Sequence, residues 1–172
     1  MRLRLKSPGL LVALAALWAV APVARAQGGS QQGSQGKDLV VPYVAPRPAN
    51  TLVMLPDGST VHVELALTPA EQAYGLMGRT SLPEGRGMLF VEAPAKHQYW
   101  MYHCKIGLDI VWMDENHTIV EMSPNTPPCK GQSATCARYG GNVISQYVLE
   151  LPVGSIEKHK LAVGERIEFR LE

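Results

Sequence analysis

The segment Thr60–Leu67 alternates between two kinds of residue, and this alternation constrains the fold more than any other feature. Val61, Val63, Leu65 and Leu67 are apolar, whereas the residues between them are polar or small. Successive side chains of a β-strand point to opposite faces, so a period of two indicates a strand. We therefore expect a strand here with one buried face and one solvated face.

The same kind of signal recurs in short segments along the rest of the chain. Branched and aromatic residues gather in runs that turn residues separate. Many short strands with few helices favour a mainly β fold, a compact β-sandwich or barrel-like domain with one or two short helices. Besides the segment above, the expected strands are Thr51–Leu55, Gly87–Val91, Gln98–Met101, Leu108–Met113, Thr118–Met122, Gln146–Leu151 and Arg166–Leu171.

One helix start is clearly marked. Thr68 is a capping residue, Pro69 suits the first helical position, and Glu71 completes a capping box. This helix is predicted to reach about Met77, with Gly78 as its C-terminal stop. A second, shorter helical turn is expected within residues 153–159. Residues 56–59 read as a turn, and residues 114–116 as a hairpin connection.

The N-terminus has the pattern of a secretory signal peptide. Three basic residues lie within the first six positions, an apolar run follows at Leu10–Ala21, and Ala24–Ala26 forms a small-x-small cleavage site. The run of 12 residues is shorter than the roughly 20 that a membrane-spanning helix needs. We expect residues 1–26 to direct export to a periplasmic or extracellular space, with no stable membrane insertion after cleavage. The pattern leaves open whether the signal is cleaved or kept as an anchor.

Cleavage would change the charge of the chain. It would leave 12 of the 16 basic residues against 15 acidic residues, a net charge of −3 with neutral histidines, because it removes Arg2, Arg4, Lys6 and Arg25. A mildly acidic chain has no electrostatic footprint for nucleic acid. The mature chain divides into a flexible tether at residues 27–50, rich in Gln, Gly and Ser and then in Pro, and a single globular domain at residues 51–172.

Three cysteines remain after residue 26. Cys129 and Cys136 bracket a short loop with six residues between them, and export permits a disulfide. We expect this bridge, because the spacing matches none of the common zinc sites. Cys104 is left over, either as a buried thiol or as a reactive one.

Three charged residues lie in apolar surroundings: Arg79, Asp109 and Glu150. A carboxylate on an apolar strand is costly to bury unless it is paired. Arg79 is expected to pair with Asp109 or Glu150 and to hold the loop after the helix against the sheet. The alternative is that the two acids form a paired-carboxylate site for general acid/base work on a sugar.

The densest aromatic cluster spans residues 99–103. On a strand, Trp100 and Tyr102 would face one way, whereas Tyr99, Met101 and His103 would face the other. One face is expected to be core. The other face would open into a groove, where aromatic rings with polar tips suit stacking against a flat ligand or a sugar ring.

A metal site and a catalytic thiol are the competing interpretations of this region. Imidazole and thiolate are good metal ligands, but adjacent strand residues such as His103 and Cys104 point to opposite faces. The same geometry separates Cys104 from a base. We expect no metal and no cofactor. The sequence also has no phosphate-binding glycine loop, nucleophile elbow or zinc-protease helix motif.

An ordered series of short motifs resembles one known family. The series is Gly75-Leu76-Met77, Arg79, Leu82, Gly87-Met88-Leu89-Phe90, Trp100-Met101, Leu108-Asp109, Pro128-Cys129, Tyr139, Tyr147-Val148-Leu149-Glu150-Leu151, Gly154 and Gly164-Glu165. Over roughly residues 52–171 it is similar to domain-of-unknown-function family 192. The resemblance implies a compact β-rich fold and brings no established activity, so it assigns no catalytic residue. His103-Cys104 departs from the family's usual Asn-Thr, Gly107 from its usual Pro, and Glu165 from its usual Asp.

Together these observations lean against an enzyme, because they contain no complete catalytic set. We expect an exported, non-catalytic module that binds a small ligand, a glycan or an envelope protein. The expected groove contains Arg79, Tyr99, Trp100, Met101, His103 and Asp109. One alternative is a hydrolase-like enzyme that uses Asp109 or Glu150 as acid or base. Another is a structural envelope protein without a ligand.

Overall fold

The computed structural model describes residues 38–171, and the predicted signal peptide and the first part of the tether lie outside them. Over these described residues the fold is mainly β, as predicted, with two short α-helices and one 3-10 turn. Its elements are β1 (Thr51–Met54), β2 (Thr60–Ala66), α1 (Pro69–Tyr74), β3 (Arg86–Ala95), β4 (Gln98–Tyr99), β5 (Leu108–Met113), β6 (Ile119–Thr126), η1 (Ser133–Thr135), β7 (Tyr139–Gly140), β8 (Ser145–Pro152), α2 (Ser155–Lys158) and β9 (Glu168–Phe169).

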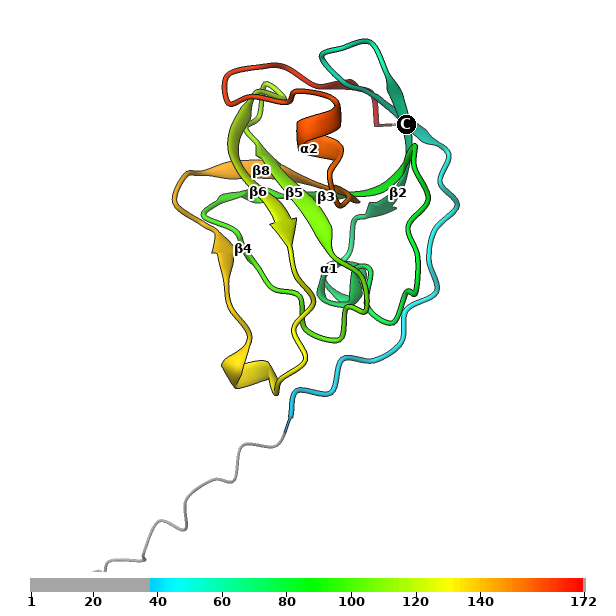
Figure 1. Ribbon diagram of the computed structural model, residues 1–172, viewed down its shortest axis with the longest axis vertical. Helices are drawn as coiled ribbons and strands as arrows, with labels where there is room; N and C mark the ends of the chain where they lie inside the picture. Colours follow the sequence, from blue (N-terminus) through cyan, green and yellow to red (C-terminus); the bar gives the residue numbers. More distant parts are fainter. Residues whose placement is uncertain (1–37, 172) are drawn as a thin grey trace, which may run out of the picture. The chain divides into compact units, whose positions relative to one another are not determined.

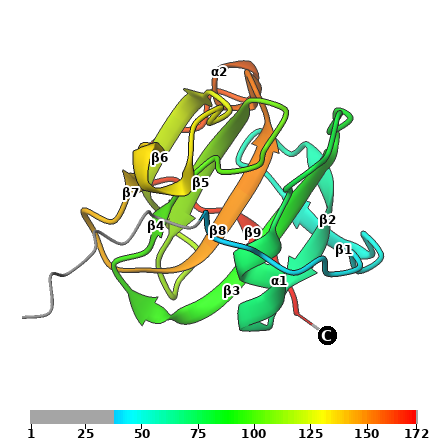
Figure 2. The same cartoon turned by 90° about the horizontal axis from the view of Figure 1, so that it is seen from below.

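Seven strands form one curled, barrel-like sheet in the order β6-β5-β8-β3-β2-β1-β9, and β4 and β7 form a separate ribbon (Figures 1 and 2). Neighbours in the large sheet are antiparallel except β2 and β3, which are parallel and which the α1 segment connects. Just before β9, the chain also bonds to the start of β6. The amide of Ile119 donates to Glu165 O, and the amide of Ile167 donates to His117 O. The C-terminal segment therefore links the two edges of the curl.

Each face of the sheet has its own hydrophobic core. The face inside the curl carries residues from every strand of the large sheet, and Ile156 of α2 and Leu161 close one end of it. The other face lies under the segment after α1 and the loop after β4, with Leu76 and Met101 packed on Phe90 and Trp112. Burial of both faces explains why all six residues of β5 are buried.

The predicted strands are all present in some form, and Leu108–Met113 has the predicted bounds. In β2, Val61 and Val63 are buried as the alternation predicts. The pattern then fails, because Ala66 is fully buried and Leu67 is exposed. The reason is local: the chain leaves the sheet for α1 directly after β2, and Leu76, in the segment after α1, packs with Ala66 on the second face of the sheet.

The predicted helix forms but ends early. Its capping box is complete, since Glu71 N donates to the Thr68 hydroxyl and the Glu71 carboxylate accepts from Thr68 N. The helix stops at Tyr74, three residues before the predicted end at Met77, because Gly75 has a φ of +47°. A Cβ at Gly75 would also lie 3.3 Å from the Phe90 ring, so the turn and its packing both favour glycine.

Residues 38–50 contain no helix or strand and lie against the domain. The Tyr102 hydroxyl donates to Leu39 O, and the Arg47 guanidinium pairs with Glu71. Tyr43 packs edge-on against Tyr74. These contacts order the part of the predicted tether that the structure describes.

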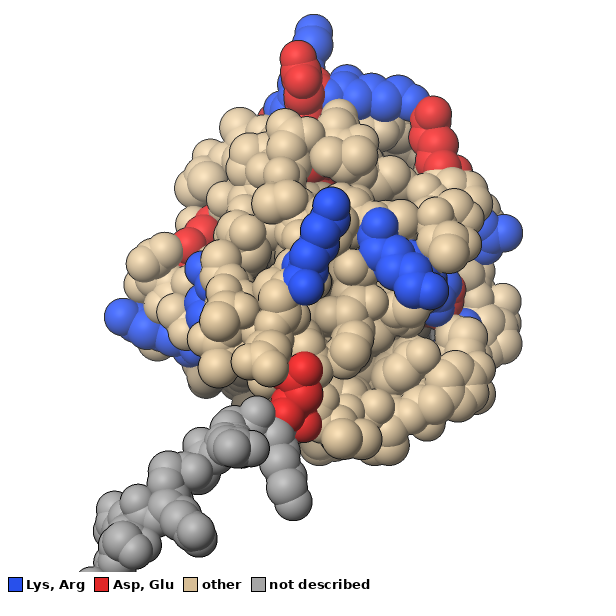
Figure 3. Space-filling model, turned by 60° about the horizontal axis from the view of Figure 1, so that its bottom comes forward, with Lys and Arg blue, Asp and Glu red and all other residues tan. Residues whose placement is uncertain are grey.

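Charged side chains are scattered over the face that Figure 3 shows, and Lys and Arg stand apart from one another on it. No continuous patch of one sign forms on this face. Within residues 38–171 there is also no helix that is long and apolar enough to cross a bilayer.

Candidate functional site

Arg79 lies in the loop after α1 and forms a two-pronged ion pair with Glu64 of β2. Each guanidinium NH2 group donates to one carboxylate oxygen, at 2.6 Å in both cases. The predicted partners were Asp109 or Glu150, and this prediction is wrong. Glu64 and Glu150 flank Met88 on the same face of the sheet, so the choice between them depends on strand register that the sequence does not reveal.

Glu150 is a buried acid in the core outside the curl, where it pairs with Met88 across the sheet. It is 4% exposed, and its Oε2 atom has no hydrogen-bond partner among the described residues. Burial raises the pKa of Glu150 from 4.5 to about 8, and nearby Arg79 opposes that rise. The carboxyl group is therefore largely protonated at neutral pH.

Cys104 lies in the same core as Glu150 and is not part of a disulfide. Its pKa is raised from 9.0 to about 12, mainly by burial and also by the Glu150 carboxylate. The thiolate is the nucleophilic form of cysteine, so this side chain is inert at neutral pH.

Asp109 occupies the other face of the sheet, inside the curl. It is fully buried, and its two oxygens each accept a backbone N–H at 2.7 Å, one from Asn125 and one from Ile156. These bonds hold the start of α2 and the end of β6 together. Asp109 thus has a structural environment in which both carboxylate oxygens are satisfied.

The aromatic segment does not form the continuous strand that was predicted. The strand ends at Tyr99, and the amide of Cys104 donates to Met101 O in a tight turn. Met101 and Tyr102 are both buried, so the predicted alternation of faces is wrong. His103 is exposed and has a φ of +56°, outside the strand region.

The six predicted binding residues therefore do not line one groove. Tyr99 and Met101 are packed in the core outside the curl, and Asp109 is on the opposite face of the sheet. Arg79, Trp100 and His103 reach the surface to different degrees. The crevice beside Arg79 has a volume of about 20 Å³, which is room for one water molecule.

Trp100 is partly covered by its own chain. The Arg138 guanidinium lies 3.8 Å from the centre of the indole ring, and Tyr102 packs against the same ring at 5.1 Å. A sugar that stacked over Arg138's side of Trp100 would have to displace this cation–π contact. Whether Trp100 or His103 binds a ligand stays a prediction.

The predicted disulfide between Cys129 and Cys136 is confirmed, with a Cα–Cα distance of 5.6 Å. It closes the loop that carries η1 and that leads to Arg138. The amides of Cys129 and Cys104 both donate to Met101 O, at 3.0 and 3.2 Å. The bridge therefore anchors this loop against the turn after β4.

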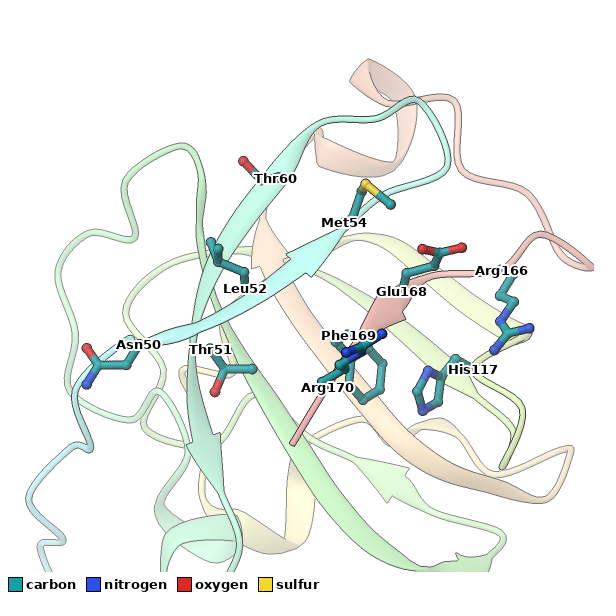
Figure 4. Close-up of a pocket in the computed structure, with 10 residues that line it drawn as sticks. All are labelled: Asn50, Thr51, Leu52, Met54, Thr60, His117, Arg166, Glu168, Phe169 and Arg170. Carbon is teal, nitrogen blue, oxygen red and sulfur yellow. The ribbon is translucent and has the colours of Figure 1, made fainter. Parts of the chain in front are cut away.

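A larger recess than the crevice beside Arg79 lies elsewhere, along β1 and β9. This cleft, which we call the β1–β9 cleft, has a volume of about 820 Å³. Figure 4 shows that its residues lie on β1 and just before it, at the start of β2, within β9 and next to its two ends, and in the hairpin before β6. Its lining is Asn50, Thr51, Leu52, Met54, Thr60, His117, Arg166, Glu168, Phe169 and Arg170.

Backbone pairing positions these side chains. Phe169 pairs with Val53 and Glu168 with Met54, while a bridge between Thr118 and Arg166 brings in the hairpin. The His117 ring stacks on Phe169, with centroids 3.8 Å apart and planes at 13° (Figure 4). The cleft thus combines an apolar strip with an aromatic pair.

The electrostatics of the cleft are positive on balance. Arg166 and Arg170 are both exposed, and neither forms an ion pair within residues 38–171. The pKa of His117 is lowered below 6.5, first by burial and then by the charge of Arg166. The lowered pKa favours the neutral form of His117, and Glu168 is the acidic residue of the lining.

No pattern in the sequence predicted this cleft as a site. The strand Arg166–Leu171 was expected, and its alternation already places Arg166, Glu168 and Arg170 on one face. This row of charged residues is the one indication of the cleft that the sequence contains. The pairing of β9 with β1 is long-range, and it was not predictable from either segment alone. Within the described residues, no cluster of three or more His, Cys, Asp or Glu side chains could hold a metal ion.

The fold and the cleft define a small barrel-like domain with a recess of ligand size. The chain belongs to domain-of-unknown-function family 192, described as "Uncharacterized ACR", whose model matches residues 52–169. This match confirms the resemblance noted in the sequence. Among curated proteins, none matches the chain.

Two solved structures are similar over most of the domain. One is a "putative transcription regulator" from Sinorhizobium meliloti 1021, with 27% identity and a TM-score of 0.61, covering 69% of this chain and 91% of that one. The other is a protein of unknown function from Novosphingobium aromaticivorans DSM 12444, with 26% identity and a TM-score of 0.62, covering 77% of this chain and 99% of that one.

Proposed function

We propose that this protein is an exported, non-catalytic module that binds a small molecule in the β1–β9 cleft. The observation that carries the proposal is the cleft itself. Its volume of about 820 Å³ lies in the range of small-molecule sites, and its lining mixes apolar and polar groups as such sites do. The crevice beside Arg79, at about 20 Å³, is far too small for a metabolite.

The side-chain chemistry supports binding rather than catalysis. Asp109 and Glu150 face opposite sides of the sheet, so they do not form an acid/base pair. Cys104 is protonated at neutral pH, since its pKa is about 12. In the cleft, no hydrogen bond among residues 38–171 joins His117 to a hydroxyl or thiol that it could activate.

Export is supported by the N-terminal sequence and by the disulfide. Residues 1–26 have the three parts of a secretory signal, and disulfides persist in oxidising compartments. The Cys129–Cys136 bridge is of the kind that such a compartment maintains. We place the protein in a periplasmic or extracellular space.

The competing site is the aromatic segment around Trp100, where a glycan or an envelope protein was expected to bind. Arg138 already lies over the Trp100 ring, and Tyr99 and Met101 are packed in the core. A binder there would gain little free aromatic surface. The cleft is therefore the stronger candidate. The test below distinguishes binding in the cleft from binding at the aromatic segment.

The test is a ligand screen on the protein that begins at residue 27, followed by amide chemical shifts in NMR. Thr60 lines the cleft and is exposed, so Thr60→Trp fills the recess from its edge. Val143→Trp is the matched control, because Val143 is 44% exposed and lies outside the cleft. We expect hits to shift resonances at Leu52 and Met54 and to lose affinity in Thr60→Trp but not in the control.

Other results would overturn the proposal. Ligands whose affinity falls when Trp100 or His103 is substituted, but is unchanged in Thr60→Trp, would place the binding site at the aromatic segment. Products released from a screened compound would indicate a hydrolase-like enzyme. A library of small metabolites and glycans that gives no shifts at all would favour a structural envelope protein.

A further inference from the structure

The charges of the cleft lie on a single stripe along its rim. Arg166, Glu168 and Arg170 alternate along the chain with Ile167 and Phe169, which are buried. In an extended segment this alternation puts the three charged side chains on one face. Arg166 and Arg170 therefore flank Glu168 along the chain, and neither arginine forms an ion pair within residues 38–171.

An apolar strip lies next to this stripe. Leu52 is 52% exposed and Met54 is 41% exposed, although each belongs to a paired strand. Met54 pairs directly with Glu168, so the strip and the stripe run side by side (Figure 4). Apolar side chains exposed together beside unpaired charges mark a surface that suits a ligand with both characters.

We propose that the ligand of the β1–β9 cleft is an amphiphilic anion, with a carboxylate or phosphate head held by Arg166 and Arg170 and an apolar body on Leu52 and Met54. This inference rests on the proposed function and specifies the ligand class. Guanidinium groups bind carboxylate and phosphate with paired, charge-assisted hydrogen bonds. A bare inorganic anion would leave most of the roughly 820 Å³ and the whole apolar strip unused.

His117 provides an independent reporter of the head group. Its side chain lies close enough to Arg166 for that charge to lower its pKa, and Figure 4 shows the Arg166 side chain directed toward it. An anion bound at Arg166 would offset the positive charge. The pKa of His117 would then rise in the complex, whereas a neutral ligand of the same size would leave it low or lower it further by burial.

The test uses three probes with the same number of carbon atoms: octanoate, octyl phosphate and the neutral octanamide. We expect both anions to shift the resonances of Leu52 and Met54 at millimolar concentration and to raise the pKa of His117 measured by NMR. Arg166→Gln and Arg170→Gln should each weaken octanoate binding by about threefold to tenfold. Lys105→Gln, at an exposed residue outside the cleft, is the control and should have no effect.

The outcomes separate this inference from the proposed function. If octanamide binds in the cleft as well as octanoate does, or if the arginine variants bind octanoate normally, the anion class is wrong and the cleft remains a binding site. If octanoate shifts only residues outside the cleft, this inference fails, and the Thr60→Trp screen then decides the proposed function alone. The relative affinities of octanoate and octyl phosphate identify the preferred head group.

Discussion

Asp109 and Glu150 lie on neighbouring strands, and yet their side chains point to opposite faces of the sheet. In the register of β5 and β8, Asp109 pairs with Leu151 and Ile110 pairs with Glu150. Both acids are buried, Asp109 inside the curl and Glu150 in the core outside it. The sheet thus separates two carboxyl groups that a glycosidase would need on either side of one bond. Their separation also gives the two acids different and independently testable roles.

Asp109 is predicted to stabilise the fold by joining α2 to the end of β6. Asp109→Asn replaces one acceptor oxygen by an NH2 group that faces a backbone N–H, so one buried donor loses its partner. We expect the free energy of unfolding to fall by about 2 to 4 kcal/mol, measured by urea denaturation. Glu157→Gln, at an exposed residue of α2, should change it by less than about 0.5 kcal/mol. A variant Asp109→Asn as stable as the wild type would contradict this role.

Glu150 is predicted to make stability fall as pH rises. Its folded pKa, about 8, lies above its ordinary value of 4.5, so the folded state holds a proton that the unfolded state releases. The protein is then most stable with respect to this group below about pH 4.5, and it loses stability progressively up to about pH 8. Glu150→Gln cannot ionise. Its stability relative to the wild type should therefore be higher at pH 8 than at pH 4.5, by on the order of 4 kcal/mol.

The measurement for Glu150 is a series of urea unfolding curves between pH 4.5 and pH 9. Glu168→Gln, at an exposed residue, serves as the matched control for the loss of one carboxylate. Parallel pH profiles for the wild type and Glu150→Gln would show that Glu150 is ionised in the folded protein, which would contradict its assigned protonation state.

Much of the fold was predictable from the sequence because it depends on local patterns. The capping residues around Glu71 and the apolar run of β5 are visible in a few adjacent positions. The aromatic segment was not predictable in the same way. Its residues have strong strand preference, but the chain turns after Tyr99, and the anchor is the distant Cys129, whose amide bonds to Met101 O.

The site residues depended even more on long-range geometry. The sequence offered Arg79 two carboxylates, Asp109 and Glu150, whereas strand register brought Glu64 within reach. The cleft arises where β9 returns to β1, so its residues are neighbours in space and far apart in the chain. Only the alternating charges of residues 166–170 were visible in the sequence, and nothing local indicated which segment they would face.

Cys104 is predicted to resist alkylation in the folded protein. With a pKa of about 12 instead of 9.0, it is almost entirely a thiol at pH 8. Iodoacetamide should therefore react on the order of a hundredfold more slowly with native protein than with protein unfolded in urea. Mass spectrometry of the alkylated protein measures both rates. Glu150→Gln should speed the native reaction modestly, because burial is the larger cause and remains. Equal rates in native and unfolded protein would show an accessible, reactive thiol.

The Cys129–Cys136 bridge is predicted to stabilise the domain by about 2 kcal/mol, since it closes a short loop. The double variant Cys129→Ser, Cys136→Ser should show this loss in urea denaturation. It should also loosen Arg138 from the Trp100 ring, which changes the tryptophan fluorescence of the folded state. Cys104→Ser is the matched control, because it removes a cysteine without breaking the bridge. Equal stability of the double variant and the wild type would mean that the loop is held by its other contacts alone.

The Arg79–Glu64 pair is predicted to contribute more than a surface ion pair. Both side chains are less than a third exposed, at 25% and 13%, and the contact uses two parallel hydrogen bonds. A double-mutant cycle with Arg79→Gln and Glu64→Gln should give a coupling energy of about 1 to 2 kcal/mol in urea denaturation. A matched double-mutant cycle on the Arg47–Glu71 pair, whose arginine is 44% exposed, should give a coupling energy under about 1 kcal/mol.

Arg79 should also affect the titration of Glu150, because its charge lowers the pKa of that acid. Arg79→Gln removes the charge, so the pKa of Glu150 should rise further and the pH at which stability is lost should move upward. Arg47→Gln removes an equal charge from the Glu71 pair at the surface and should leave that pH unchanged. If both variants move it equally, the effect comes from net charge, and Arg79 has no specific influence on the buried acid.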